Sequence, residues 1–258
     1  MSFQSDYSKL YDTFNSEKNY AAESNFVSTV FKKFSSIQEP LSILDLGCGS
    51  GKHLFELEKL FTNGVKITGV EKSVNLCEQA KQLLGTKAEI HSCDITEFAS
   101  AEKFDLIVSL FHVSAYQTTS AEFLKFIEIV SHNLSDRGVA IIDFWNRTAW
   151  FDDPPIIRSK SAQFENMVYE RISVPEIDLL NGTLVLTMDI ERVTETSREK
   201  IVTEFHALRA LTLFEIELAA SANGLSVNHF GAWMKIESPL TIDTWYGYTV
   251  LSKPKKGI

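Results

Sequence analysis

The sequence predicts an α/β fold in which a mostly parallel, seven-stranded sheet is flanked by helices and a small antiparallel sheet is inserted. Between residues 20 and 145, short apolar runs alternate with helical patterns, as in successive strand–helix units. Residues 165–211 instead show three runs of period two, joined by turn sequences such as Asn181-Gly182. With 258 residues, of which 44% are hydrophobic, the chain is long enough to bury a large core.

The elements of the parallel part follow in chain order. Residues 20–34 place five apolar side chains, among them Phe26 and Val30, on one helical face. Thr119 and Glu122 have the spacing of a capping box, which predicts that a helix begins after Thr119. The other elements of this part are strands expected at 43–46, 65–70, 87–91, 104–110 and 138–144, and helices expected at 52–61 and 74–84.

The pattern changes after Trp145. The next stretch, residues 146–163, contains Pro154-Pro155 and is predicted to form a loop. The three runs of period two that follow predict antiparallel strands at 165–174, 183–193 and 200–211.

A second capping box, Thr212 with Glu215, predicts a helix that ends near Gly224. Two final strands, at 225–233 and 243–251, would complete the main sheet. The expected organisation has three parts, namely an N-terminal helical lid with the first half of the main domain (1–145), an inserted antiparallel unit (146–211), and the remainder of the main domain (212–258).

Composition narrows the possible partners. The formal net charge of −9 has the wrong sign for a protein that binds nucleic acid through phosphate contacts. No stretch approaches the roughly 20 apolar residues of a membrane span, and the N-terminus lacks the apolar core of a signal peptide, so we expect a cytoplasmic protein without a membrane partner. The spacing of Cys48, Cys77 and Cys93 predicts neither a disulfide framework nor a metal site.

A glycine-rich loop, Asp45-Leu46-Gly47-Cys48-Gly49-Ser50-Gly51, connects the first strand to a helix. Glycines allow a sharp turn and close approach of a ligand, and the N–H groups of the following helix favour negative charge. A dinucleotide fingerprint would need glycine where Lys52 stands, and a phosphate-binding P-loop would need glycine at Leu46 and a hydroxyl residue at His53. Neither pattern fits.

The loop resembles the Asp-x-Gly-x-Gly-x-Gly loop of class I S-adenosylmethionine-dependent methyltransferases, which have a Rossmann-like fold. The resemblance implies that Glu71, at the end of the second strand, holds the ribose hydroxyls, and that Asp94 faces the adenine amino group. Such sites lie at the carboxyl ends of parallel strands and form one crevice. The full set expected around S-adenosylmethionine is Tyr20, Asp45, Gly47, Gly49, Gly51, His53, Glu71, Lys72, Asp94, Ile95 and Leu110.

A narrower resemblance suggests the methyl acceptor. The segments 10–12, 18–23, 110–116 and 209–214 are similar to the N,N-dimethyltransferases of dTDP-linked amino sugars, which also carry a small antiparallel sheet. The resemblance implies a role near the reacting centre for Tyr11. Tyr116 stands where those enzymes have histidine, which leaves the identity of any base open, and His112 is an additional candidate.

Alternatives remain at this stage. The acceptor could be a hydroxyl group or the amine of another small metabolite, and a non-catalytic partner subunit is a third possibility, although the intact glycines and Glu71 argue against it. A sugar nucleotide would need local cations on this acidic protein. The candidates are Arg147, Arg158, Lys160 and Arg171, and a homodimer formed through the inserted sheet is also expected.

Overall fold

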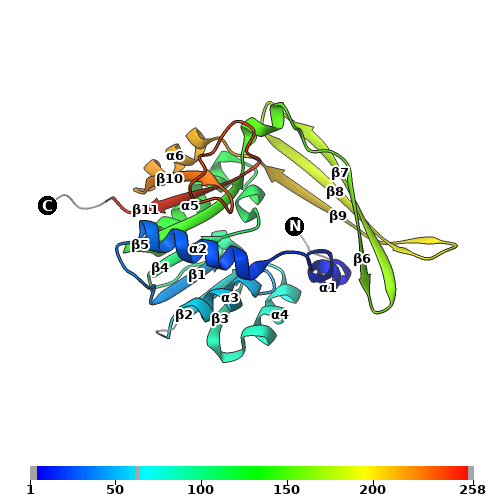
Figure 1. Cartoon of the computed structure of the whole chain (residues 1–258), viewed down its shortest axis with the longest axis horizontal. Coiled ribbons are helices and arrows are strands. Elements are labelled where there is room, and N and C mark those ends of the chain that lie inside the picture. Colours follow the sequence, from blue (N-terminus) through cyan, green and yellow to red (C-terminus); the bar gives the residue numbers. More distant parts are fainter. Residues whose placement is uncertain (1–4, 62–63, 255–258) are drawn as a thin grey trace.

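The computed structural model describes residues 5–61 and 64–254, which form two sheets (Figure 1). The main sheet has seven strands in the order β10-β11-β5-β4-β1-β2-β3, and the second has four in the order β6-β7-β8-β9. The predicted fold class is thereby confirmed. The strands of the main sheet are β1 (Ser42–Leu46), β2 (Lys66–Glu71), β3 (Ala88–Ser92), β4 (Phe104–Ser109), β5 (Leu134–Trp145), β10 (Ser226–Ala232) and β11 (Tyr246–Ser252).

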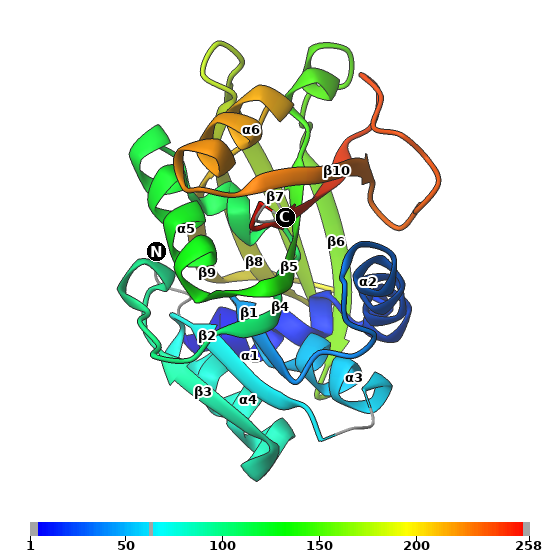
Figure 2. The ribbon, with the colours of Figure 1, turned by 90° about the vertical axis from the view of Figure 1, so that its left-hand side faces the viewer.

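Strands β1 to β5 are parallel, and β11 runs antiparallel to both β5 and β10. The continuous apolar runs of these strands are explained by helices on both faces, because a parallel sheet buries both of its sides. Figure 2 shows α2 (Tyr20–Phe34) and α3 (Lys52–Leu60) on one side and α5 (Ser120–Asn133) and α6 (Leu213–Ala222) on the other. Helix α4 (Val74–Leu84) packs into the same core cluster as α2 and α3.

Local capping signals fix where several helices begin. Thr119 caps α5 and Thr212 caps α6, and in each case the glutamate three residues later returns the bond to the capping residue. Both predicted capping boxes are therefore confirmed. Ser73 accepts the hydrogen bond of Leu76 N–H and caps α4.

The second sheet is antiparallel throughout and is formed by β6 (Arg158–Phe164), β7 (Met167–Asp178), β8 (Thr183–Val193) and β9 (Arg198–Arg209). The prediction of a loop over 146–163 was wrong for residues 158–163, where β6 pairs with β7. Its sequence, RSKSAQF, has almost no apolar alternation because β6 is a polar edge strand. The expected hairpin at Asn181-Gly182 is confirmed, with a four-residue connection between Asp178 and Thr183.

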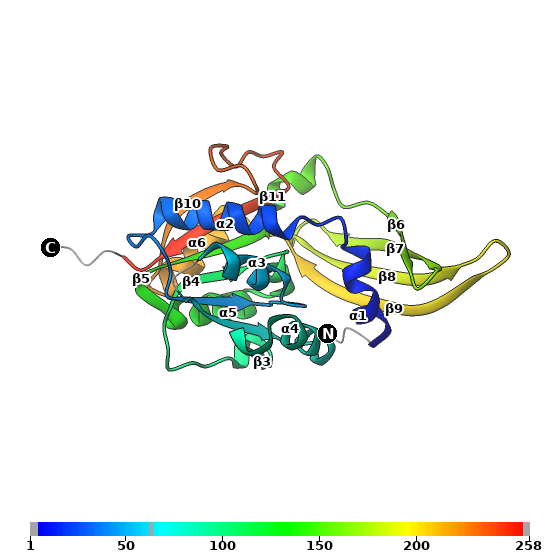
Figure 3. The same ribbon diagram turned by 60° about the horizontal axis from the view of Figure 1, so that its bottom comes forward.

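The N-terminal helix α1 (Ser5–Phe14) lies against the second sheet (Figure 3). Its residues Leu10 and Phe14 pack with Met188 and Ile190 of β8. The chain then crosses to α2 on the main sheet, so the N-terminal segment spans the space between the two sheets. None of the helices in the described ranges is long and apolar enough to cross a membrane.

Candidate active site

One large cavity, of about 1210 Å³, lies between the carboxyl ends of the parallel strands and the second sheet. Such strand ends are the usual ligand-binding edge of a parallel sheet. Two of the predicted site residues, Asp45 and Gly51, lie behind the cavity surface. The others line it: Tyr11, Tyr20, Gly47, Gly49, His53, Glu71, Lys72, Asp94, Ile95, Leu110, His112 and Tyr116.

Glycine is needed at the three positions of the loop for different structural reasons. All have positive φ, of 88° at Gly47, 55° at Gly49 and 82° at Gly51, a region that glycine enters without steric cost. A Cβ atom on Gly47 would lie 2.6 Å from the side chain of Val113, and one on Gly51 would lie 3.1 Å from Cβ of Ala80. A Cβ atom on Gly49 would meet nothing within 4 Å, so the loop leaves open space for a ligand at this position.

Glu71 ends β2 and stands directly beside this open space. One carboxylate oxygen accepts the N–H of Gly49 at 3.0 Å and the other accepts the N–H of Ser73 at 2.7 Å. Burial raises the pKa of Glu71, whereas the backbone hydrogen bonds lower it, and the net shift is upward. Each carboxylate oxygen keeps further acceptor capacity, which suits a ligand with two hydroxyl groups.

Asp45 lies behind the loop on β1 and is 1% exposed. Neither of its carboxylate oxygens has a hydrogen-bond partner among the described residues. Burial, together with the nearby carboxylates of Glu71 and Asp143, raises its pKa to about 8. The surroundings of Asp45 therefore favour its protonated form.

Lys72 and Asp94 form an ion pair of 2.7 Å at one end of the cavity. Thr96 donates both its backbone N–H and its hydroxyl to Asp94, which caps the short 3₁₀-helix Ile95–Glu97. Burial raises the pKa of Asp94, but the bonds from Lys72 and Thr96 outweigh it and lower the pKa to about 2. Asp94 is thus both a cap residue and a fixed carboxylate on the cavity wall, with the apolar side chain of Ile95 next to it.

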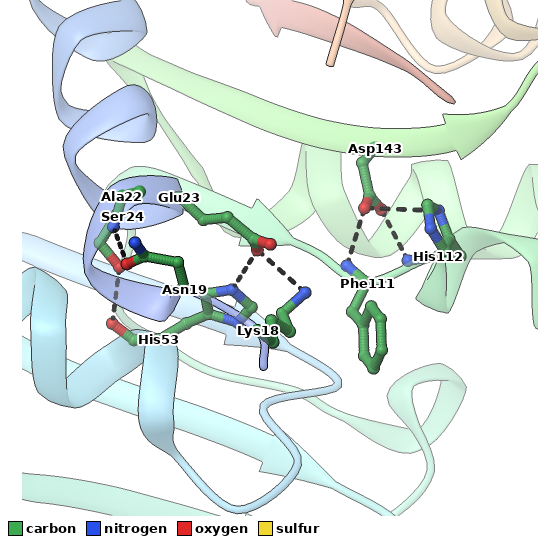
Figure 4. Close-up of polar contacts among 9 residues, drawn as sticks. All are labelled: Lys18, Asn19, Ala22, Glu23, Ser24, His53, Phe111, His112 and Asp143. Carbon is green, nitrogen blue, oxygen red and sulfur yellow. Dashed lines mark hydrogen bonds and ion pairs between the residues drawn. The ribbon is translucent and has the colours of Figure 1, made fainter. Parts of the chain in front are cut away.

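Tyr20 and His53 come together where α2 meets α3, with ring centroids 4.9 Å apart. His53 Nε2 lies 2.7 Å from Glu23, and Lys18 lies 2.9 Å from the same carboxylate (Figure 4). Burial lowers the pKa of His53 even though Glu23 opposes the shift. Tyr20 and His53 are predicted site residues, whereas Lys18 and Glu23 are not.

The three residues expected near the reacting centre, Tyr11, His112 and Tyr116, also line the cavity. The Tyr11 ring lies edge-on to Phe111, with centroids 6.5 Å apart. The hydroxyl of Tyr116 lies 3.1 Å from Nδ1 of His206, a residue of β9. Burial lowers the pKa of His206 to about 4.

His112 is stacked on Tyr246, with ring centroids 5.0 Å apart, and also lies beside Trp145. Burial lowers the pKa of His112 to about 3, so the imidazole is neutral at physiological pH. These aromatic neighbours were not among the predicted site residues. The position of Trp145 at the carboxyl end of a parallel strand was the available signal.

The second sheet supplies cations and apolar groups to the same cavity. Of the four cationic candidates, Arg158 and Arg171 line the cavity. Lys160 instead pairs with Glu17 at 2.8 Å, and Arg147 donates to the backbone carbonyls of the β7–β8 turn. The apolar part of this wall includes Leu184, Leu186 and Met188 of β8.

Comparison with known proteins shows which family the chain belongs to. A family model described as a methyltransferase domain matches residues 37–207. The chain belongs to this family. The methyltransferase uses S-adenosylmethionine, and the open space at Gly49 beside the two acceptor oxygens of Glu71 fits a ligand with a ribose diol.

Three known proteins illustrate the similarity. The methyltransferase is 27% identical over 232 residues to dTDP-3-amino-3,4,6-trideoxy-alpha-D-glucopyranose N,N-dimethyltransferase of Streptomyces venezuelae, covering 88% of this chain and 93% of the relative. It is 26% identical over 232 residues to dTDP-4-amino-2,3,4,6-tetradeoxy-D-glucose N,N-dimethyltransferase of Saccharopolyspora spinosa, covering 88% of each. The crystal structure of Streptomyces venezuelae DesVI has the same fold, with a TM-score of 0.78 at 21% identity over 98% of this chain and 100% of DesVI.

Proposed function

We propose that this enzyme methylates the amino group of a nucleotide-linked, dTDP-type amino sugar. The observation that carries the proposal is the similarity to two dTDP-amino sugar N,N-dimethyltransferases across 88% of the chain. Further support comes from the cavity of about 1210 Å³, which exceeds the roughly 300–1,000 Å³ of ordinary small-molecule pockets. It has room for a methyl donor and a large acceptor together.

At the cofactor end, we propose that Glu71 accepts the ribose hydroxyls and that Asp94 and Ile95 hold the adenine. Tyr20 and His53 would hold the methionine part, and Gly47, Gly49 and Gly51 allow the loop to approach the ligand. When bound, S-adenosylmethionine supplies an electrophilic methyl group. The chain must hold that group in line with the attacking atom, because this geometry is the main requirement of the displacement.

At the acceptor end, we propose that Tyr11, His112 and Tyr116 orient the amine. An amine attacks only when it is unprotonated. Burial lowers the pKa of His112 to about 3 and that of His206, which lies behind Tyr116, to about 4. Both are therefore poor proton acceptors at neutral pH, which favours orientation of the lone pair over general-base catalysis.

For the nucleotide part, we propose that Arg158 and Arg171 bind the diphosphate. Guanidinium groups form strong, bidentate hydrogen bonds with phosphate oxygens.

We also propose that the unit 146–211, which contains both arginines, shapes the acceptor site. The outer face of its sheet exposes Val174, Val185 and Phe205, which supports the expected homodimer. Light scattering during gel filtration of the purified enzyme tests for that dimer. We expect the enzyme to work in the cytoplasm.

The test of the proposed acceptor is a set of matched substrates incubated with the purified enzyme and S-adenosylmethionine. The set contains dTDP-3-amino and dTDP-4-amino hexoses, the corresponding dTDP-hexose with a hydroxyl in place of the amine, and the free amino sugar. We expect mass spectrometry to detect methyl addition to a dTDP-amino sugar alone or preferentially. Methyl addition to the hydroxyl compound instead, or to none of the dTDP-linked compounds, would contradict the proposal.

A further inference from the structure

The turn that follows β4 carries residues of the acceptor end in an unusual backbone conformation. Phe111 has φ of 66° and His112 has φ of 64°, so two successive side-chain-bearing residues occupy the left-handed region, which non-glycine residues rarely adopt. Phe111 and His112 both line the cavity. A turn of this kind persists only where surrounding contacts hold it in place.

We propose, on the basis of the methyl-transfer function described above, that Asp143 is a positioning residue that holds the Phe111–His112 turn at the acceptor end of the cavity. Lys18 secures the same turn through the side chain of Phe111. Neither side chain was assigned a role from the sequence.

Asp143 binds the backbone of the turn with both carboxylate oxygens. One oxygen accepts the N–H of Phe111 at 2.8 Å and the other accepts the N–H of His112 at 2.8 Å (Figure 4). Asp143 is 1% exposed and stands near the end of β5, which pairs with β4 in the sheet. An ionised carboxylate presents acceptors on both oxygens, whereas an asparagine side chain presents an acceptor on one side only.

The charge of Asp143 is sensitive to its surroundings. Burial raises its pKa to about 7, although the N–H groups of His112 and Phe111 and the cation of Lys18 lower it. The other ionisable groups near it are Glu23, Asp45, His53 and the imidazole of His112, whose Nδ1 lies 3.5 Å away.

Lys18 contacts the turn through the aromatic ring of Phe111. Its ammonium group lies 3.6 Å from the ring centroid, within the range of a cation–π interaction. The same ammonium group pairs with Glu23 at 2.9 Å, and Glu23 binds His53 at 2.7 Å. Because His53 belongs to α3, which begins at the glycine loop, these contacts connect the cofactor end of the cavity with the turn at the acceptor end.

The functional consequence follows from the geometry of methyl transfer. The reacting atoms must be in contact and in line, and a displacement of about 1 Å can reduce the rate by about 100-fold. Release of Phe111 or His112 from the left-handed region would move its side chain relative to the cavity. Asp143 and Lys18 therefore act through Phe111 and His112.

The experiment compares Asp143→Asn and Lys18→Met with the wild-type enzyme. We expect kcat to fall by about 10- to 100-fold in Asp143→Asn, with the KM for the acceptor and the affinity for S-adenosylmethionine changed by less than about threefold. Lys18→Met should also lose kcat, and Lys18→Arg, which keeps the cation, should lose less. Lys125→Met, on the exposed side of α5, is the control variant and should behave like the wild-type enzyme.

Amide hydrogen exchange gives a readout that does not depend on the acceptor. The amides of Phe111 and His112 should exchange faster in Asp143→Asn, while those of β1 should not change. Unchanged exchange at Phe111 and His112, or unchanged kcat, would overturn the inference. If Asp143→Asn does not fold, Lys18→Met decides the question: a kcat equal to that of the wild-type enzyme would overturn it.

These outcomes are separable from those that test the acceptor. A wild-type enzyme that methylates none of the dTDP-amino sugars would contradict the proposed function. The exchange rates of the Phe111 and His112 amides would then still support or overturn the role of Asp143.

Discussion

Two backbone hydrogen bonds hold the carboxylate of Glu71 in one orientation. Its two oxygens are oriented by backbone N–H groups of the glycine loop and of the residue before α4. The carboxylate is therefore pre-organised, and little conformational entropy is lost when a ligand binds.

Replacing this carboxylate should weaken cofactor binding. In Glu71→Ala, both acceptors for the ribose hydroxyls are lost, and hydrogen bonds to a charged group contribute about 1.5–3 kcal/mol. We expect the Kd for S-adenosylmethionine, measured by isothermal titration calorimetry, to rise by about 10- to 100-fold. Glu71→Gln keeps one acceptor, so its Kd should lie between that of the wild-type enzyme and that of Glu71→Ala. An unchanged Kd in Glu71→Ala would contradict the ribose assignment.

Substitutions at two glycines of the same loop should have different consequences. At Gly49, φ of 55° makes valine strained, but its side chain would enter open space, so Gly49→Val should fold with some loss of stability and bind S-adenosylmethionine more than about 100-fold more weakly. At Gly47, an added Cβ would lie 2.6 Å from Val113, so Gly47→Ala should lower the thermal unfolding midpoint. Calorimetry and thermal melting of both variants separate the two effects. Unchanged affinity for S-adenosylmethionine in Gly49→Val would show that the cofactor does not lie against Gly49.

Asp45 should make the stability of the protein depend on pH. Burial raises its pKa from 3.8 to about 8 in the folded protein, so the unfolded chain binds fewer protons between these values, and the folded state becomes less stable as pH rises from about 4 to about 8. In Asp45→Asn this contribution is absent. We expect its unfolding midpoint to change less over that pH range than that of the wild-type protein, as measured by thermal melting at a series of pH values.

Local spacing along the chain indicates some residues of the site, whereas others are brought together only by the fold. The glycine loop and Glu71 could be predicted because spacing along the chain places them at adjacent strand ends. The contacts of Asp143 with Phe111 and of His206 with Tyr116 join positions that are 32 and 90 residues apart. No local pattern specifies such pairs.

At the scale of the elements, helix starts were predictable and one strand was not. Capping boxes are specified within four residues, so the beginnings of α5 and α6 could be read directly. The edge strand β6 depends on pairing with β7, and its own sequence has little apolar alternation. An edge strand of this type is defined by its neighbour.

The cap of α6 provides a direct test of this local specification. Thr212 accepts the N–H of Glu215, and the carboxylate of Glu215 accepts the N–H of Thr212. Thr212→Ala removes the hydroxyl and should lower the free energy of unfolding by about 1 kcal/mol, as measured by urea denaturation. Thr212→Ser keeps the hydroxyl and should lose much less. Equal losses in the two variants would show that the capping bond contributes little.

At the scale of the whole molecule, the net charge of −9 and a diphosphate-bearing acceptor oppose each other. The fold offers a local solution, since the second sheet turns Arg158 and Arg171 toward the cavity while Lys160 is paired elsewhere. Among the described residues, the second sheet thus supplies Arg158 and Arg171 to the cavity, and the other two lysine or arginine side chains that line it, Lys52 and Lys72, stand at the start of α3 and after β2.

Removing these two cations should therefore affect the acceptor and not the cofactor. In the double variant Arg158→Gln/Arg171→Gln, we expect the KM for a dTDP-amino sugar to rise by about 10-fold or more, because charge-assisted hydrogen bonds to the phosphates are lost. The Kd for S-adenosylmethionine should stay within about twofold of the wild-type value. Lys160→Gln, which changes a cation of the same sheet that pairs with Glu17, is the matched control.

The salt dependence of the KM gives a second test of the same two cations. Because screening weakens interactions between exposed charges, added salt should raise the wild-type KM more than that of the double variant. A KM that is unchanged in the double variant would place the diphosphate elsewhere on the protein.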